Sequence, residues 1–99
     1  MRPIYLAKLD KTRPALLLTR AAVVPHLAWV TVAPITSTIR GLSTEVLVGR
    51  ANGLERDCVV NCDNITTVAV DLLGREIGLL LANQEEQLTL AIMAAFDLE

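Results

Sequence analysis

The chain has 99 residues, the length of one domain with one modest core, so we predict a single domain over residues 1–99. Apolar residues make up 53% of it and aromatic residues only 3%, whereas soluble domains use about 45–50% apolar residues. Charged residues interrupt each apolar stretch before the ~20 residues of a membrane-spanning helix, and the first stretch, residues 3–7, is too short for a signal peptide. The apolar excess therefore predicts a core and a protein interface, most simply that of a homodimer.

The net charge of -2 conceals a difference between the two halves of the chain. Residues 1–50 carry seven basic and two acidic side chains, whereas the remaining residues carry two basic and nine acidic ones. This pattern excludes a uniformly basic surface for bulk nucleic-acid binding, but it suggests a local positive face that would receive an anionic ligand. Charge scattered over solvated loops explains the same pattern equally well.

The predicted elements are mostly short strands separated by turn signals. Residues 4–9 alternate moderately, residues 15–19 are continuously apolar like a central strand, and residues 29–35 are β-branched and alternating. Further strands are expected at residues 44–49, 58–62, 66–70 and 76–82, with turns at Arg40-Gly41, Ala51–Gly53, Asp63-Asn64 and Leu73-Gly74. Many short strands at this spacing predict a small barrel or sandwich.

The C-terminal segment has the periodicity of an α-helix. The apolar residues that follow helical spacing are Leu88, Ala91, Ile92, Ala95 and Phe96. Asn83 is expected as the N-cap, with Glu86 completing a capping box. A second short helix is expected near residues 20–24, ending before Pro25. The chain is thus predicted to be mainly β, closed by one helix whose apolar stripe packs on the core.

Cys58 and Cys62 do not form a disulfide framework. Four positions apart in a predicted strand, they share one face, with Cα atoms roughly 13 Å apart, too far for a disulfide. Two thiols and the lone His26 do not make a zinc site. We interpret the cysteines as small buried residues and His26 as a surface or packed residue. The lack of a disulfide favours the reducing cytoplasm, and neither metal nor cofactor is predicted.

Two segments carry polar groups suited to chemistry. Arg13 and Pro14 begin an apolar strand, and residues 33–41, APITSTIRG, end another. The second segment offers four hydroxyl or guanidinium donors, namely Thr36, Ser37, Thr38 and Arg40. A plain loop would account for this run as well, since Ser and Thr are common turn residues.

The segments TRPALLLTR, VTVAPITSTIRGLSTEVLV, NGLERDCVVNCDNITTV and GREIGLLL occur in this order. Together they resemble the MazF/PemK family of toxin endoribonucleases, over about residues 4–97. The resemblance implies a small SH3-like barrel with helices, as in CcdB-type gyrase poisons, and a cytoplasmic homodimer neutralised by a cognate MazE-type antitoxin. It also implies metal-independent, sequence-specific cleavage of single-stranded RNA, in which the 2′-hydroxyl attacks and leaves 2′,3′-cyclic phosphate and 5′-hydroxyl ends.

The resemblance places the family's arginine before proline at Arg13 and its threonine at Thr36. A guanidinium stabilises the negative charge that develops on the phosphoryl oxygens, and it would also pass a proton to the leaving oxygen. A threonine hydroxyl is suited to orienting the 2′-hydroxyl or a phosphate oxygen. Pro14 restricts Arg13 to extended conformations. Further RNA contacts are expected from Lys11, Thr12, Ser37, Thr38 and Arg40.

The chain departs from the family pattern in the loop before Arg13, which is cut to residues 10–12. Acidic or histidine groups proposed in the family as proton acceptors from that loop have no aligned counterpart. Asp10 lies nearby in sequence, and the general base stays open. Trp29 is interpreted as the single large core residue, with stacking on a base as the alternative.

Two other functions compete with RNA cleavage. A CcdB-like poison that binds a topoisomerase would share the fold, but the chain ends AAFDLE, without the Trp-Gly-Ile ending on which that family's gyrase contact depends. A degenerate homologue that only binds the antitoxin is the third possibility.

Overall fold

A computed structural model describes residues 2–98, which form seven strands, one α-helix and five 3-10 turns. The strands are β1 (Pro3–Lys8), β2 (Thr12–Leu17), β3 (Trp29–Thr36), β4 (Glu45–Val48), β5 (Cys58–Asn61), β6 (Thr66–Ala69) and β7 (Leu73–Leu79). The helical elements are η1 (Ala21–His26), η2 (Arg50–Asn52), η3 (Cys62–Asn64), η4 (Val70–Leu72), η5 (Ala82–Gln84) and α1 (Glu85–Ala95). Among the described residues, no helix has the length and apolar character needed to cross a membrane.

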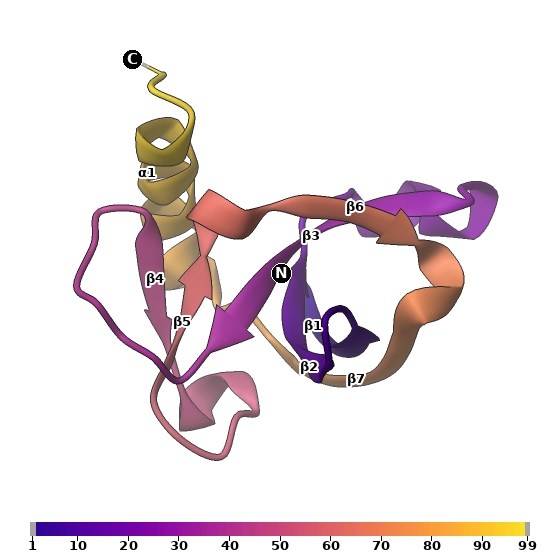
Figure 1. The fold of residues 1–99 in the computed structure, drawn as a ribbon, viewed down its shortest axis with the longest axis horizontal. Coiled ribbons are helices and arrows are strands. Elements are labelled where there is room, and N and C mark those ends of the chain that lie inside the picture. The colour runs from indigo at the N-terminus through magenta and orange to yellow at the C-terminus, as the bar shows by residue number, and fades with distance from the viewer. Residues whose placement is uncertain (1, 99) are drawn as a thin grey trace.

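The strands form one curled antiparallel sheet with the order β4-β5-β3-β2-β1-β7, and β6 pairs with β3. The long strand β3 organises this sheet, because its first part pairs with β2 and β6 and its last two residues pair with β5. Figure 1 shows α1, β4 and β5 gathered on one side of the molecule and β6 and β7 curling around the other. The prediction of a mainly β, SH3-like barrel with a C-terminal helix is confirmed.

Two strand boundaries differ from the prediction in ways that bear on function. Strand β2 runs from Thr12 to Leu17, so Arg13 and Pro14 lie near its start as predicted, but it ends two residues before the predicted Thr19. Strand β7 begins at Leu73, and the predicted turn at Leu73-Gly74 is therefore wrong. The neighbouring strand favours glycine at position 74, because a Cβ there would lie only 3.1 Å from the carbonyl oxygen of Leu6.

The core is aliphatic and falls into two clusters, one under β4, β5 and α1 and one between β2, β3 and β6. Cys58 and Cys62 are free and lie in the first cluster, which confirms their prediction as small buried residues. The predicted strand at 58–62 ends one residue early, so Cys62 begins η3. Burial raises the pKa of the Cys62 thiol to about 11 and also raises that of Cys58.

The prediction that Trp29 fills the core is wrong, since Trp29 is 61% exposed. Its neighbours Val30 and Val32 on β3 are buried in the second core cluster. Because side chains alternate along a strand, Val30 points into that cluster and Trp29 points away from it. Short aliphatic side chains fill the core instead.

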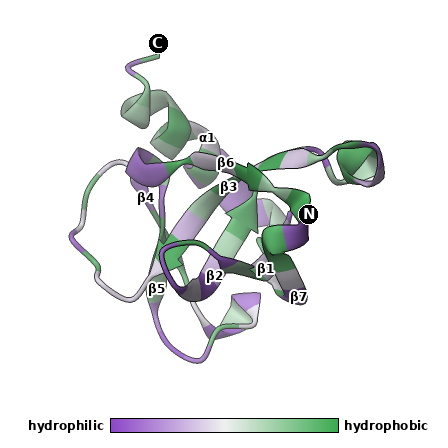
Figure 2. Cartoon of the chain, turned by 45° about the vertical axis from the view of Figure 1, so that its right-hand side comes forward, coloured by the Kyte–Doolittle hydropathy of each residue, from purple (hydrophilic) through white to green (hydrophobic). Residues whose placement is uncertain are grey.

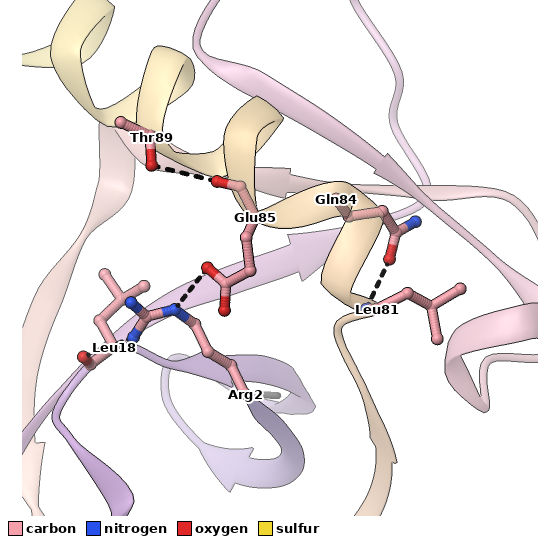
Figure 3. A network of polar contacts seen from close by, with 6 residues as sticks. All are labelled: Arg2, Leu18, Leu81, Gln84, Glu85 and Thr89. Atoms are coloured by element: carbon pink, nitrogen blue, oxygen red, sulfur yellow. Dashed lines mark hydrogen bonds and ion pairs between the residues drawn. The ribbon is translucent and has the colours of Figure 1, made fainter.

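The α-helix begins differently from the prediction, because η5 precedes it and Asn83 does not cap it. The Gln84 side chain instead accepts a hydrogen bond from the Leu81 N–H at 2.9 Å. Arg2 Nε donates a hydrogen bond to Glu85 Oε2 at 3.1 Å (Figure 3). Arg2 Nη1 also donates to the Leu18 carbonyl at 3.0 Å. Through Arg2, these contacts join the residue before β1 and the residue after β2 to the positive end of α1.

The apolar stripe of α1 packs against the core as predicted, except at its end. Leu88 and Ala91 are buried, and Ile92 and Ala95 pack against the first core cluster. Phe96, just after the last helical residue, is 55% exposed. The short helix predicted near residues 20–24 is η1, which continues through Pro25 to the exposed His26.

A buried polar contact connects η2, β7 and η5. We call it the Asn52 junction, after the residue at its centre, which is 2% exposed. Asn52 Nδ2 donates to the Leu79 carbonyl at 2.9 Å and to Gln84 Oε1 at 2.6 Å, and Asn52 Oδ1 accepts from the Gly49 N–H at 3.0 Å. Each polar atom of this buried side chain is therefore satisfied.

Candidate functional site

The antiparallel register of β2 and β3 brings Arg13 and Thr36 to one edge of the sheet. Their pairing runs from Leu17–Val32 to Ala15–Pro34. The same register continued by two positions sets Arg13 opposite Thr36, so the two side chains leave the sheet on the same face. Thr36 also pairs with Val59 of β5, which places it where the sheet changes partner strands.

Two hollows meet at this edge, and both are lined by Arg13, Thr36 and Thr38. The smaller has a volume of about 450 Å³, and we call it the acidic hollow because its charged lining consists of Asp10, Arg13, Arg40, Glu45 and Asp63. The larger has a volume of about 790 Å³, and we call it the basic groove because its charged lining consists of Lys11, Arg13, Glu55, Arg56, Arg75 and Glu76. Arg13 and Thr36 thus lie between surfaces of opposite charge.

Arg13 is held by a two-pronged ion pair with Asp10. Arg13 Nε donates to Asp10 Oδ1 at 3.0 Å and Arg13 Nη2 donates to Asp10 Oδ2 at 2.8 Å. The tight turn between β1 and β2, closed by the Leu9 N–H on the Lys11 carbonyl at 3.1 Å, places the carboxylate beside the guanidinium. The Arg13 hydrogen bonds hold the pKa of Asp10 below its usual value of 3.8. Asp10 is therefore ionised at neutral pH.

The shortened loop before Arg13 thus places a carboxylate, that of Asp10, beside the guanidinium. The signal in the sequence was the spacing Asp10-x-x-Arg13, which brings the two side chains together only if residues 9–11 form a tight turn between paired strands. Thr12 pairs with Lys8 in that hairpin. Without the register, the same spacing fits an extended loop equally well.

Thr36 keeps a hydroxyl proton available at the meeting point of the two hollows. Its Oγ1 accepts a hydrogen bond from the Thr38 N–H at 3.2 Å. A hydroxyl that accepts in this way still has its own proton to donate. Thr36 is half-buried, whereas Ser37 and Thr38 are exposed.

The loop after Thr36 is fixed by the carboxylate of Glu45. Glu45 Oε1 accepts from the Arg40 N–H at 3.2 Å and from the Leu42 N–H at 3.1 Å. These two contacts close the connection between β3 and β4, which carries Thr38 and Arg40 over the acidic hollow. No role for Glu45 was predicted from the sequence.

The expected RNA-contacting residues divide between the two hollows. Lys11 and Ser37 line the basic groove, Arg40 lines the acidic hollow, Thr38 lines both, and Thr12 lines neither.

The basic groove also contains Arg56 and Arg75, which the sequence analysis missed. These are the two basic residues of the acidic half of the chain, so charge counted along the sequence concealed them. The lone His26 lines neither hollow. Within residues 2–98, no three His, Cys, Asp or Glu side chains gather as a metal site requires.

Comparison with known proteins shows the class to which this fold and site belong. Residues 3–96 match the PemK-like, MazF-like toxin family of type II toxin–antitoxin systems, and the chain belongs to this family. It is 61% identical over 99 residues to Endoribonuclease MazF3 of Mycobacterium tuberculosis (strain CDC 1551 / Oshkosh), covering 100% of this chain and 96% of that protein.

Solved structures of similar proteins support the same family assignment. The structure of Mycobacterium tuberculosis toxin MazF-mt6 is 60% identical, with a TM-score of 0.97 and 99% of both chains covered. An endoribonuclease in complex with its cognate antitoxin, from Mycobacterial species, is 28% identical, with a TM-score of 0.86 and coverage of 98% of this chain and 93% of that one. The resemblance stated from the sequence motifs is thereby confirmed.

Proposed function

We propose that this protein is a toxin endoribonuclease that cleaves single-stranded RNA at a short sequence in the cytoplasm, without a metal ion. The observation that carries the proposal is the pairing of Arg13 and Thr36 at one edge of the sheet, where both line both hollows. The names of the relatives, endoribonucleases at 61% and lower identity, support the same reaction class.

In the proposed reaction, the 2′-oxygen of the RNA attacks the adjacent phosphorus and the bond to the 5′-oxygen breaks. The products carry a 2′,3′-cyclic phosphate and a 5′-hydroxyl. A guanidinium has five N–H groups, of which Asp10 occupies two on Arg13, so three remain for the phosphate. Because the ion pair fixes the guanidinium before substrate arrives, Arg13 stabilises the developing charge with little reorganisation.

The proton of the attacking 2′-hydroxyl requires an acceptor, and we assign this role to Asp10. Its carboxylate is ionised at neutral pH and lies against Arg13 in the acidic hollow. Each carboxylate oxygen has a second lone pair that the Arg13 contact leaves open. Thr36 would donate its hydroxyl proton to a phosphate oxygen or orient the 2′-hydroxyl, and Arg13 would pass a proton to the leaving 5′-oxygen.

The proposal includes one toxin domain over residues 1–99, a homodimer and a cognate MazE-type antitoxin. Exposed apolar side chains support such interfaces, because Trp29, Leu47, Leu90, Phe96 and Leu98 are each 55–61% exposed. The mycobacterial structure of an endoribonuclease with its cognate antitoxin supports the second partner.

The experiment that tests the proposed function is primer extension on a long RNA incubated with pure protein in excess EDTA, with analysis of the product ends. We expect cleavage at one short sequence, reduced about 10²–10³-fold in Arg13→Ala through loss of charge stabilisation. Thr36→Ala should be strongly reduced as well. Arg20→Ala and Thr89→Ala, which lie outside both hollows, serve as matched controls and should cleave like the unsubstituted protein.

Three results would contradict this proposal. Cleavage that persists in Arg13→Ala would remove the assigned site, and cleavage that needs a divalent metal would remove the mechanism. Intact RNA combined with inhibition of gyrase supercoiling would favour the CcdB-like topoisomerase poison.

A further inference from the structure

The two hollows beside Arg13 differ in charge. The basic groove has four basic and two acidic side chains, whereas the acidic hollow has two basic and three acidic ones. Both include Arg13 and Thr36. A polyanion that places one phosphate on Arg13 therefore meets net positive charge on one side and net negative charge on the other.

Arg56 and Arg75 are available for an external anion. Arg2 and Arg13 each have a carboxylate partner within hydrogen-bond distance. By contrast, neither Arg56 nor Arg75 makes an ion pair with any residue between 2 and 98, and both are exposed. Their guanidinium forks match the geometry of a phosphate, which two parallel N–H groups bind in bidentate fashion.

The backbone directs Arg75 to the groove. Strand β1 lies between β2 and β7, and Ala7 pairs with Arg13 on one side and with Leu73 on the other. The register of β1 and β7 shifts between Tyr5 and Ala7, so Gly74 and Arg75 together oppose a single residue of β1. Such a bulge bends the strand and re-aims the side chain that it contains. Two strand spacings, roughly 10 Å, separate β7 from the strand of Arg13.

Arg56 approaches from a different part of the chain. It lies in the segment between η2 and β5, and Figure 2 shows the segment leading into β5 as hydrophilic. Lys11, at the tip of the β1–β2 turn, completes the basic lining with Arg13. The segments that carry Lys11, Arg56 and Arg75 thus converge on one groove, although Lys11 and Arg75 lie 64 positions apart in the sequence.

The apolar part of the groove lining also suits a single strand of nucleic acid. Leu6, Pro14 and Ile77 lie in it among the charged residues. No aromatic side chain of the described residues lines it, so bases that stack there would stack on guanidinium planes, which arginine offers and lysine does not.

We propose that RNA on one side of the cleaved phosphate lies in the basic groove, where Arg56 and Arg75 bind flanking phosphates and set the affinity for the substrate. This inference rests on the proposed RNA substrate and adds the path of the strand. Arg56 and Arg75 are positioning residues, because they hold the strand while Arg13 acts on the reacting phosphate.

The test separates binding from cleavage by comparing Arg56→Gln, Arg75→Gln and the double variant with Arg20→Gln and Arg50→Gln. The two controls remove the same charge from exposed arginines outside both hollows. The probe for binding is a fluorescent single-stranded RNA that spans the cut sequence mapped by primer extension, with a 2′-deoxynucleotide at the cut. Anisotropy over a range of NaCl concentrations gives the affinity and its salt slope, and single-turnover kinetics on the all-ribose RNA gives the cleavage rate.

We expect the double variant to bind RNA about 10- to 100-fold more weakly at low salt. Two lost phosphate contacts should lower the magnitude of the salt slope by about 1.4, at about 0.7 for each contact on a single strand. The cleavage rate at saturating RNA should stay within about twofold, whereas Arg13→Ala loses that rate. Both controls should bind like the unsubstituted protein.

The groove proposal is overturned if the double variant keeps its affinity and salt slope, or if the controls lose as much affinity as the double variant does. Unchanged RNA affinity with weaker binding of an acidic peptide would assign the groove to a protein partner and overturn the RNA path. If no cut is mapped, the probe is a single-stranded RNA of mixed sequence; unsubstituted protein that binds it with the expected salt slope but leaves RNA intact would contradict the proposed function while retaining the groove. Unsubstituted protein that does not bind RNA overturns the groove proposal whatever else it does.

Discussion

The Asn52 junction and the Arg13–Asp10 pair, which we call the Arg13 site, each contain a short hydrogen bond between two side chains, but in different surroundings. At the junction, the side chains of Asn52 and Gln84 meet at 2.6 Å with Asn52 2% exposed. At the site, the side chains of Arg13 and Asp10 meet at 2.8 Å, and the Asp10 side chain is 72% exposed. The first contact joins η2 to η5, 32 positions away in the sequence, whereas the second lies within one hairpin.

The difference separates stability from function. A buried polar group that loses its partner cannot turn to water, so its desolvation cost stays in the folded state. An exposed ion pair that is broken regains its hydration and contributes little to stability. The junction should therefore determine whether the chain folds, and the exposed contact should determine where the Arg13 guanidinium points.

The largest expected loss of stability comes from Asn52→Leu. The substitution leaves the Gly49 N–H and the Leu79 carbonyl without the partners that the Asn52 side chain provides. We expect the free energy of unfolding to fall by about 3–5 kcal/mol, from several unsatisfied groups at about 1–3 kcal/mol each. Urea unfolding followed by circular dichroism measures this change.

The matched control is Asn83→Leu, which changes an exposed asparagine outside both hollows and should stay within about 0.5 kcal/mol. A loss below about 1 kcal/mol in Asn52→Leu would show that the junction does not stabilise the fold and would remove the contrast between the two regions.

A smaller loss is expected from Gly78→Ala, which tests the close approach of η2 and β7 at the junction. A Cβ on Gly78 would collide with the Asn52 carbonyl oxygen, and neither backbone can move without disturbing the junction. We expect a loss of about 1–3 kcal/mol, as for other overpacked sites, again measured by urea unfolding.

Gly41→Ala is the control for that loss, because Gly41 has φ of 73° and no heavy atom within 4 Å of its ideal Cβ position. Its cost should be the backbone penalty alone, about 1–2 kcal/mol. Both glycine variants are also measured in the Asn52→Leu background. If the loss of stability from Gly78→Ala is the same there as in the unsubstituted protein, as it should be for Gly41→Ala, the close approach is independent of the junction. A Gly78→Ala effect that shrinks when Asn52 is replaced would tie the two together.

Predictions that rest on the periodicity of strands and helices are confirmed, whereas the local signals for a turn at Leu73-Gly74 and a cap at Asn83 were wrong. The strands at 29–35 and 66–70 and the stripe of α1 follow from periodicity, and the structure has β3, β6 and α1 there. Arg13 and Thr36 were assigned to one site because the family resemblance assigned a role to both residues. Periodicity alone contains no information on which strand lies beside which.

The rest depends on register, burial and long-range approach. Trp29 looked like core because it is large, but its position on β3 exposes it. Seven steps of strand, roughly 23 Å, separate it from Thr36, so it lies far from the proposed site along β3. Arg75 reaches the groove through a bulge, and Asn52 is buried by elements about 30 positions away. Residue type and local pattern do not encode the placements of Arg75 and Asn52.

The smallest effect on stability, and the sharpest test of the contrast, is Asp10→Asn. The substitution removes a charge and one of the two acceptors that Arg13 uses, yet it keeps the size of the side chain. We expect the midpoint of urea unfolding to match that of the unsubstituted protein, because the substituted side chain is 72% exposed and stays hydrated. The single-turnover cleavage rate should fall by about 100-fold or more through loss of the proton acceptor.

The pH dependence separates this role from a structural one. Because Arg13 holds the pKa of Asp10 below 3.8, the stabilising effect of this ion pair is present above that pH and is lost only as pH falls through the lower native value. Cleavage by the unsubstituted protein should therefore show no acid limb from Asp10 between pH 5 and 8, and Asp71→Asn, an exposed carboxylate outside both hollows, should leave the rate unchanged. An Asp10→Asn variant that unfolds earlier but cleaves normally would mean that the exposed contact serves stability after all, and the acceptor would then have to be sought in Glu45 or Asp63 across the acidic hollow.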